Sequence, residues 1–145
     1  MDTREREILL VEDNPGDAEL ARHAFREAGV NANLRVASDG NAAVRYLRGE
    51  GLHADRPEPD FALLDLRMPG MDGFAVLREV KGDPTLRSIP IVVLTTSTAD
   101  SDVAAAFKLH ANAYHRKPVA FGDFVELAGE LSVYWLDTVV TPRSG

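Results

Sequence analysis

The stretch Phe61–Gly73, FALLDLRMPGMDG, joins an apolar run to a glycine-bounded helix through a loop that begins with a carboxylate. The first four residues are too short for a confident helix and are typical of a strand buried on both faces of a parallel sheet. After the loop, Phe74–Lys81 is predicted as a helix between Gly73 and Gly82. The stretch therefore predicts a strand followed by a helix, with Asp65 at the carboxyl end of the strand.

The same alternation of short apolar runs and helical patterns extends in both directions from this stretch. Further strands are predicted at Ile8–Val11, Leu34–Ala37, Ile91–Leu94 and Ala113–His115. Further helices are predicted from the Asn14 cap and Pro15 to Gly29, over Ala42–Leu47, over Asp102–His110 and from about Phe121 onward. Strands that alternate with helices indicate a parallel sheet with helices on both faces, joined by right-handed crossovers. Gly49–Asp60 is predicted to be a long surface loop.

The last predicted helix carries more apolar residues than one core-facing stripe needs. The stripe consists of Phe124, Leu127, Ala128, Leu131 and Trp135, and the extra apolar residues are Val133, Leu136, Val139 and Val140. Extra apolar surface often marks an interface, so a homodimer through the C-terminal helix region is expected. The alternative is that this segment folds back on its own domain.

Composition limits the classes of protein that the chain can belong to. Its 145 residues, with 45% hydrophobic and 27% charged, predict a single domain over 1–145, with a core at about 7–136 and an extension at 137–145. The absence of cysteine excludes disulfides and thiolate metal sites. The net charge of −7 makes nucleic acid an unfavourable partner. Neither a transmembrane run nor a secretion signal is expected, so a cytoplasmic location is predicted.

Polar side chains follow four of the predicted strands where each strand ends. They are Glu12 and Asp13, Asp65, Thr95, and Lys117. In an open parallel sheet, chemistry takes place beyond the carboxyl ends of the strands. Each residue alone is commonly a cap, a turn residue or a surface charge, but four strand ends that carry such groups indicate a site. Clustered carboxylates need a hard cation such as Mg²⁺, beside which a carboxylate can attack phosphorus while a lysine and a hydroxyl bind phosphoryl oxygens.

Four segments give the chain a resemblance to a known family. They are Ile8–Asn14 (ILLVEDN), Leu63–Gly73 (LLDLRMPGMDG), Ile89–Thr95 (IPIVVLT) and Tyr114–Pro118 (YHRKP). Over nearly its whole length the chain resembles bacterial response regulator receiver domains. The resemblance implies an α/β, flavodoxin-like (βα)5 doubly wound parallel sheet with strand order 2-1-3-4-5.

The resemblance also implies a metal site at which the phosphoryl group is accepted. It implies that Asp65 is the phosphoryl acceptor and that Asp13 and Asp65 bind Mg²⁺ directly. Glu12 is implied to contact the metal through water. The main-chain carbonyl of Arg67 is implied to be a further ligand, although an arginine side chain at this position departs from the commoner small polar residue.

The remaining implied roles concern the phosphoryl oxygens and the conformational switch. Thr95 and Lys117 would bind the phosphoryl oxygens, and Pro118 would follow Lys117 through a cis peptide bond. In the family, the threonine moves toward the phosphate and an aromatic side chain turns inward. Tyr114 occupies the position of that aromatic residue.

The resemblance implies a signalling protein that catalyses only its own phosphorylation and dephosphorylation. Its phosphodonor would be a sensor histidine kinase, and its output would be contact with another protein. Three segments, Gly49–Asp60, Leu94–Ser97 and Tyr134–Leu136, resemble the small receivers that accompany bacterial phytochrome kinases. The alternatives are a phosphate-independent scaffold and a phosphorelay intermediate or phosphate sink. A phosphatase or kinase on the same sheet is disfavoured because the chain has no cysteine and no GxxxxGK[ST] motif.

Overall fold

A computed structural model of the chain describes residues 5–140, which include a five-stranded parallel sheet. The strands are β1 (Glu7–Val11), β2 (Asn33–Ala37), β3 (Phe61–Leu64), β4 (Ile91–Thr95) and β5 (Ala113–Arg116). Their order is β2-β1-β3-β4-β5, and every neighbouring pair is parallel. The predicted doubly wound fold with strand order 2-1-3-4-5 is confirmed.

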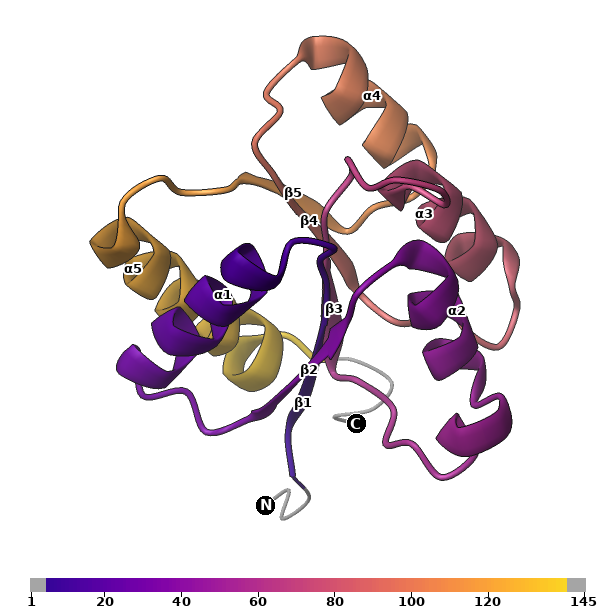
Figure 1. The fold of residues 1–145 in the computed structure, drawn as a ribbon, viewed down its shortest axis with the longest axis horizontal. Helices are drawn as coiled ribbons and strands as arrows, with labels where there is room; N and C mark the ends of the chain where they lie inside the picture. The colour runs from indigo at the N-terminus through magenta and orange to yellow at the C-terminus, as the bar shows by residue number, and fades with distance from the viewer. Residues whose placement is uncertain (1–4, 141–145) are drawn as a thin grey trace.

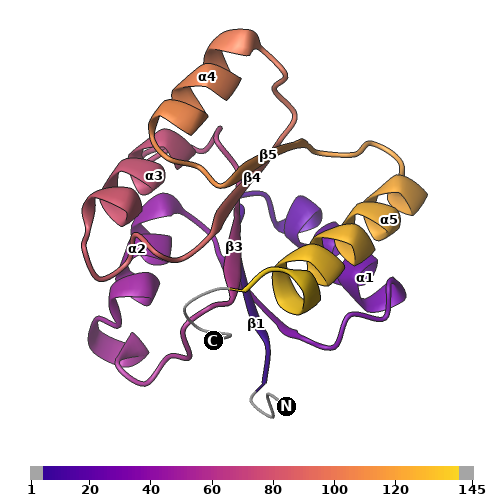
Figure 2. The same ribbon diagram turned by 180° about the vertical axis from the view of Figure 1, so that it is seen from behind.

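Five α-helices cover the two faces of the sheet. They are α1 (Pro15–Glu27), α2 (Gly40–Arg48), α3 (Gly73–Gly82), α4 (Asp100–Lys108) and α5 (Phe121–Ser132). Helices α1 and α5 lie on one face, and α2, α3 and α4 lie on the other (Figure 1). Figure 2 shows the same division from behind. The side chains of Asn14, Asp39 and Asp72 each accept a hydrogen bond from a backbone amide of the helix that follows, so they fix where α1, α2 and α3 begin.

Burial explains why some strands had clearer sequence signals than others. Every residue of β1, β3 and β4 is buried, which accounts for their continuous apolar runs. The edge strands β2 and β5 are partly exposed and therefore carry polar residues among apolar ones. The long loop between α2 and β3 contains a short 3₁₀ helix, Gly51–His53. Glu12 directly follows β1, Asp65 directly follows β3, and Thr95 is the last residue of β4, so each buried strand leads to one of these polar residues.

The C-terminal part of the described chain continues α5 as a π-helical turn, η2 (Val133–Thr138). Trp135 and Leu136 are buried in the core on the α1–α5 side, and the Arg6 guanidinium donates a hydrogen bond to the Leu136 carbonyl. Leu136 therefore folds back on its own domain, as the alternative interpretation expected. Val133, Tyr134 and Val140 stay exposed, at 57%, 51% and 82%. The rest of the predicted extension, 141–145, lies outside the described residues.

Within residues 5–140, no helix is long and apolar enough to cross a lipid bilayer. Helix α5 with its continuation η2 runs from Phe121 to Thr138, which is still short of the roughly 20 predominantly apolar residues that a span needs.

Candidate acidic site at the carboxyl edge of the sheet

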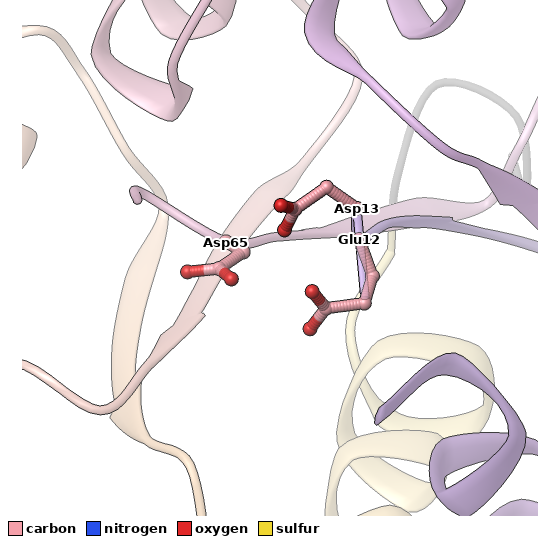
Figure 3. Close-up of side chains that lie close together, drawn as sticks. All are labelled: Glu12, Asp13 and Asp65. Atoms are coloured by element: carbon pink, nitrogen blue, oxygen red, sulfur yellow. The ribbon is translucent and has the colours of Figure 1, made fainter. Parts of the chain in front are cut away.

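Three carboxylates meet where β1 and β3 end. One oxygen from each of Glu12, Asp13 and Asp65 lies within 4.8 Å of the others. Figure 3 shows the three side chains gathered around one space, with two coming from the end of β1 and one from the end of β3. The sheet creates this cluster because β1 and β3 pair in register, with Val11 beside Leu64, so both strands end at the same level. Carboxylate oxygens in this arrangement suit a hard divalent cation.

Lys117 brings a positive charge to the cluster from the segment after β5. Its Nζ lies 2.5 Å from Glu12 Oε1, 3.4 Å from Asp17 Oδ2 and 3.6 Å from Asp65 Oδ2. Burial by itself would lower the pKa of Lys117. The hydrogen bond to Glu12 and the negative charges of Asp65, Glu12 and Asp17 outweigh burial, so the pKa is raised. Lys117 therefore carries a positive charge at this site near neutral pH.

Glu12 is deeply buried, with 4% of its surface exposed. Burial raises the pKa of Glu12 above its ordinary value. Hydrogen bonds from Lys117 and from the Asn14 amide, which lies 3.1 Å from Glu12 Oε2, act in the opposite direction. Ionisation of Glu12 is unfavourable because the residue is buried beside other carboxylates. A cation bound in the space between them would stabilise the charged form of Glu12.

Thr95 ends β4 with a buried hydroxyl that has no hydrogen-bond partner. Buried polar atoms are almost always paired, so an unpaired one in a site of this kind fits a group that is absent from the structure. A phosphoryl oxygen would supply an acceptor for this hydroxyl. The main-chain carbonyl of the same residue accepts a 2.7 Å hydrogen bond from the Lys117 amide, which fixes the chain after β5 against β4.

The predicted cis peptide bond between Lys117 and Pro118 is wrong for this structure, because no cis peptide bond occurs among residues 5–140. The trans isomer is the more stable one even before proline, by about 0.5–1 kcal/mol. The hydrogen bond from the Lys117 amide to Thr95 forms with the trans bond, and the lysine side chain reaches Glu12 and Asp65.

Two further predicted site residues lie beside the cluster. Arg67 follows Asp65 by two residues, and its amide donates a 3.2 Å hydrogen bond to Asp65 Oδ1. Its guanidinium points to α4, where it donates a 2.6 Å hydrogen bond to Asp102 Oδ2. Tyr114, in β5, is half-buried and donates a 2.8 Å hydrogen bond from its hydroxyl to the Ser97 carbonyl.

The structure also brings in residues that the sequence analysis gave no site role. Asp17, in the first turn of α1, is a further carboxylate partner of Lys117 beside Glu12 and Asp65. Ser97 and Asp102 join Arg67 and Tyr114 in one hydrogen-bonded group. Asp17 lies three residues after the Asn14 cap, and an acidic residue in the first turn of a helix needs no further explanation, so no sequence pattern indicated its contact with Lys117.

Comparison with known proteins assigns this fold and site to a family. Residues 8–128 match the response regulator receiver domain family. The chain is 38% identical over 137 residues to response regulator Rcp1 of Synechocystis sp., covering 94% of this chain and 93% of Rcp1. It is 45% identical over 131 residues to the probable methanogenesis regulatory protein FilR2 of Methanothrix harundinacea, covering 89% and 83%.

Solved structures agree with this assignment. The phosphorylated cyanobacterial phytochrome response regulator RcpA superposes with a TM-score of 0.89 at 38% identity, covering 96% of this chain and 99% of RcpA. The Mn²⁺-bound form of Rcp1 has a TM-score of 0.84 at 38% identity, covering 94% and 99%. The chain belongs to the response regulator receiver domain family. Members of this family bind a divalent metal ion and act in phosphorelay signalling.

Proposed function

We propose that Asp65 accepts a phosphoryl group from a sensor histidine kinase in a Mg²⁺-dependent reaction, and that the chain then signals by contact with another protein. The observation that carries the proposal is the convergence of three carboxylates within 4.8 Å, with the Lys117 ammonium 3.6 Å from Asp65. The family resemblance assigns the acceptor role to Asp65, which follows β3, the central strand of the sheet. The chain catalyses only its own phosphorylation and dephosphorylation.

The proposed metal ligands are Asp13, Asp65 and the main-chain carbonyl of Arg67, with Glu12 acting through water. Mg²⁺ prefers oxygen ligands, uses few carboxylates and keeps several waters, so this donor set suits it. Once bound, the ion neutralises charge on the carboxylates and on the phosphoryl oxygens. The three side chains of the cluster are all carboxylates and the chain lacks cysteine, so these side chains offer a metal oxygen ligands and no thiolate.

The proposed step forms a bond between a carboxylate oxygen of Asp65 and phosphorus. The P–N bond of the donor phosphohistidine breaks, and the released imidazole takes up a proton from solvent. The Lys117 ammonium and the Thr95 hydroxyl bind phosphoryl oxygens in this step, which relies mainly on positioning and charge neutralisation. The unpaired, buried state of the Thr95 hydroxyl supports this role.

The proposal is tested by incubating the protein with acetyl phosphate and Mg²⁺ and measuring its intact mass. We expect one added phosphoryl group, lost when a chelator removes the metal. Asp65→Asn, which keeps the shape of the side chain, should gain none. Phosphorylation of Asp65→Asn to the wild-type level would refute the assignment. A wild-type protein that neither gains mass nor binds beryllofluoride would favour the phosphate-independent scaffold.

Mg²⁺ affinity should fall as the pH decreases from neutral toward the ordinary glutamate pKa of 4.5. Burial raises the pKa of Glu12, so this residue takes up a proton at a higher pH than an exposed glutamate does. Protonation removes a negative charge from the site, and protons therefore compete with the metal. Isothermal titration with Mg²⁺ over this pH range measures the effect. Glu12→Gln, which cannot titrate, should show weaker binding with a flatter pH dependence, and an unchanged pH dependence would contradict the prediction.

We propose a phytochrome-type, light-regulated histidine kinase as the donor. The support is similarity to response regulators of that class, RcpA among them, over nearly the whole chain. A phosphorelay intermediate stays open as the alternative output. The proposed output is contact with protein and not with nucleic acid, because the net charge of −7 opposes binding to a phosphate backbone. A cytoplasmic location remains a prediction from composition.

We also propose that two copies of the chain associate through the α5–η2 region. Tyr134 is 51% exposed and lines two apolar grooves, one of about 460 Å³ beside β5 and one of about 620 Å³ between α1 and α5. Val133, 57% exposed, lines the second groove. Strand β5 is at the edge of the sheet, so no other strand of the described chain pairs with one side of its backbone. These features favour a second copy as the partner.

Val133→Glu should weaken the dimer by more than about tenfold, because a charge on the proposed contact surface loses its water when the copies meet. Val133 is exposed in the single chain, so the fold should be unaffected. Analytical ultracentrifugation over a concentration series gives the dissociation constant. Val119→Glu, on an exposed valine of the β5–α5 loop, is the matched control and should leave it unchanged. A wild-type mass that stays monomeric at every concentration would refute the dimer.

A further inference from the structure

A chain of hydrogen bonds links the loop after β3 to α4 and β5 beside the acidic site. Arg67 Nη2 donates to Asp102 Oδ2 at 2.6 Å, and Ser97 Oγ donates to the same oxygen at 2.6 Å. Tyr114 Oη donates to the Ser97 carbonyl at 2.8 Å. The Asp102 carboxylate thus ties the loop after β3 to the β4–α4 segment, and the Ser97 carbonyl ties that segment to β5. We call these four residues, Arg67, Ser97, Asp102 and Tyr114, the Arg–Asp–Tyr network.

The carboxylate at the centre of the network is held in its charged form. Asp102 is 13% exposed, and hydrogen bonds from Ser97 and from Arg67 lower its pKa. Hydrogen bonds to an ionised group are about twice as strong as those between neutral groups. The Arg67 guanidinium also lies 5.7 Å from the centre of the Phe74 ring, which adds a cation–π contact. The network is therefore better held than an isolated surface ion pair.

The network fixes the side chain to which the resemblance assigns the switch. Tyr114 packs against the core on the α2–α4 side of the sheet, and its hydroxyl reaches the β4–α4 segment. Thr95, the last residue of β4, lies two residues before Ser97, and its hydroxyl is buried without a partner. The Tyr114 ring therefore lies against the core while its hydroxyl is held by the segment that follows Thr95.

We propose that Arg67 and Asp102 are positioning residues that hold Tyr114 and the β4–α4 segment in the conformation to which the phosphoryl group at Asp65 binds. The inference rests on the proposed phosphorylation of Asp65. A ligand binds more tightly when the competent conformation is already populated, because affinity is reduced by the fraction of molecules in other conformations. Loss of the network should therefore weaken binding of a phosphoryl mimic at Asp65.

Beryllofluoride titration at saturating Mg²⁺ tests the inference. Asp102→Ala should bind beryllofluoride about three- to tenfold more weakly than the wild type, as expected for coupled neighbours. Asp100→Ala is the matched control, because it removes the same charge from an exposed position in the same first turn of α4. Loss of a negative charge alone would favour the anionic mimic, so a weaker affinity in Asp102→Ala cannot come from charge. In a Tyr114→Phe background, Asp102→Ala should add little, since both changes interrupt one network.

A second readout follows Tyr114 without any phosphate. The chain has three tyrosines, so 3-fluorotyrosine labelling gives few ¹⁹F NMR signals, and Tyr114→Phe identifies the relevant one. Its position should change little when beryllofluoride binds the wild type. In Asp102→Ala it should be shifted in the free protein and return on binding. Equal beryllofluoride affinities in Asp102→Ala and Asp100→Ala would overturn the inference and leave the proposed function intact. A wild type that binds no beryllofluoride would overturn both.

Discussion

Replacing Lys117 by methionine should slow phosphorylation of Asp65 by about 10²–10³-fold, the usual effect of removing one preorganised charge or donor from a transition state. Lys117 Nζ lies within 3.6 Å of both Glu12 and Asp65, and 12% of its side chain is exposed. Without the ammonium, the phosphoryl oxygens would approach three carboxylates with one fewer positive charge to oppose them. The rate is measured by intact mass over time with acetyl phosphate at saturating Mg²⁺.

Lys108→Met supplies the matched control, because it removes an exposed lysine from α4, outside the acidic site. It should be phosphorylated at the wild-type rate. Circular dichroism checks that Lys117→Met is folded, since removal of one partner leaves Glu12 buried beside other carboxylates. Lys117→Arg, which keeps the charge but changes its shape, should recover part of the rate. A folded Lys117→Met protein with the wild-type rate would refute the role of the lysine.

Gly73→Ala should destabilise the fold by about 3 kcal/mol, at the upper end of the usual cost of overpacking. A Cβ at this position would lie 2.4 Å from the Asp65 carbonyl oxygen and 2.6 Å from the Leu66 Cα. Both are backbone atoms, so no side chain can rotate to make room. The start of α3 or the end of β3 must move, and Asp65 moves with them. Urea denaturation measures the free energy of unfolding.

Gly82→Ala is a close control, because it places the same methyl group at the other end of α3, where nothing lies within 4 Å. It should be neutral or slightly stabilising, by up to about 1 kcal/mol, since alanine restricts the unfolded chain more than glycine does. Equal stabilities of the two variants would show that the loop after β3 can relax around the extra atom. Gly73→Ala should also phosphorylate more slowly, because the acceptor carboxylate is displaced.

Much of the fold could be predicted because each local signal had one physical cause. Phe61–Leu64 and Ile91–Leu94 are apolar throughout because the middle strands are covered on both faces. The side chain of Asn14 starts α1 as predicted, and the strand order implied by the family resemblance was correct. Leu136 was misplaced on the outside, because its burial depends on a π-helical turn that rotates it toward the core. The 3.6-residue periodicity of an α-helix does not predict a π-helical turn at this position.

The sequence by itself determined the alternation of strands and helices and which residues stand at the strand ends, because periodicity and capping act over a few neighbours. It therefore identified Glu12, Asp13, Asp65, Thr95 and Lys117 as one group before any geometry was known. Only the tertiary structure decided which side chains touch: Lys117 with Asp17, and Arg67 with Asp102. These pairs are 100 and 35 residues apart. Contacts at such separations depend on how helices pack on the sheet, and neither residue type nor spacing records that packing.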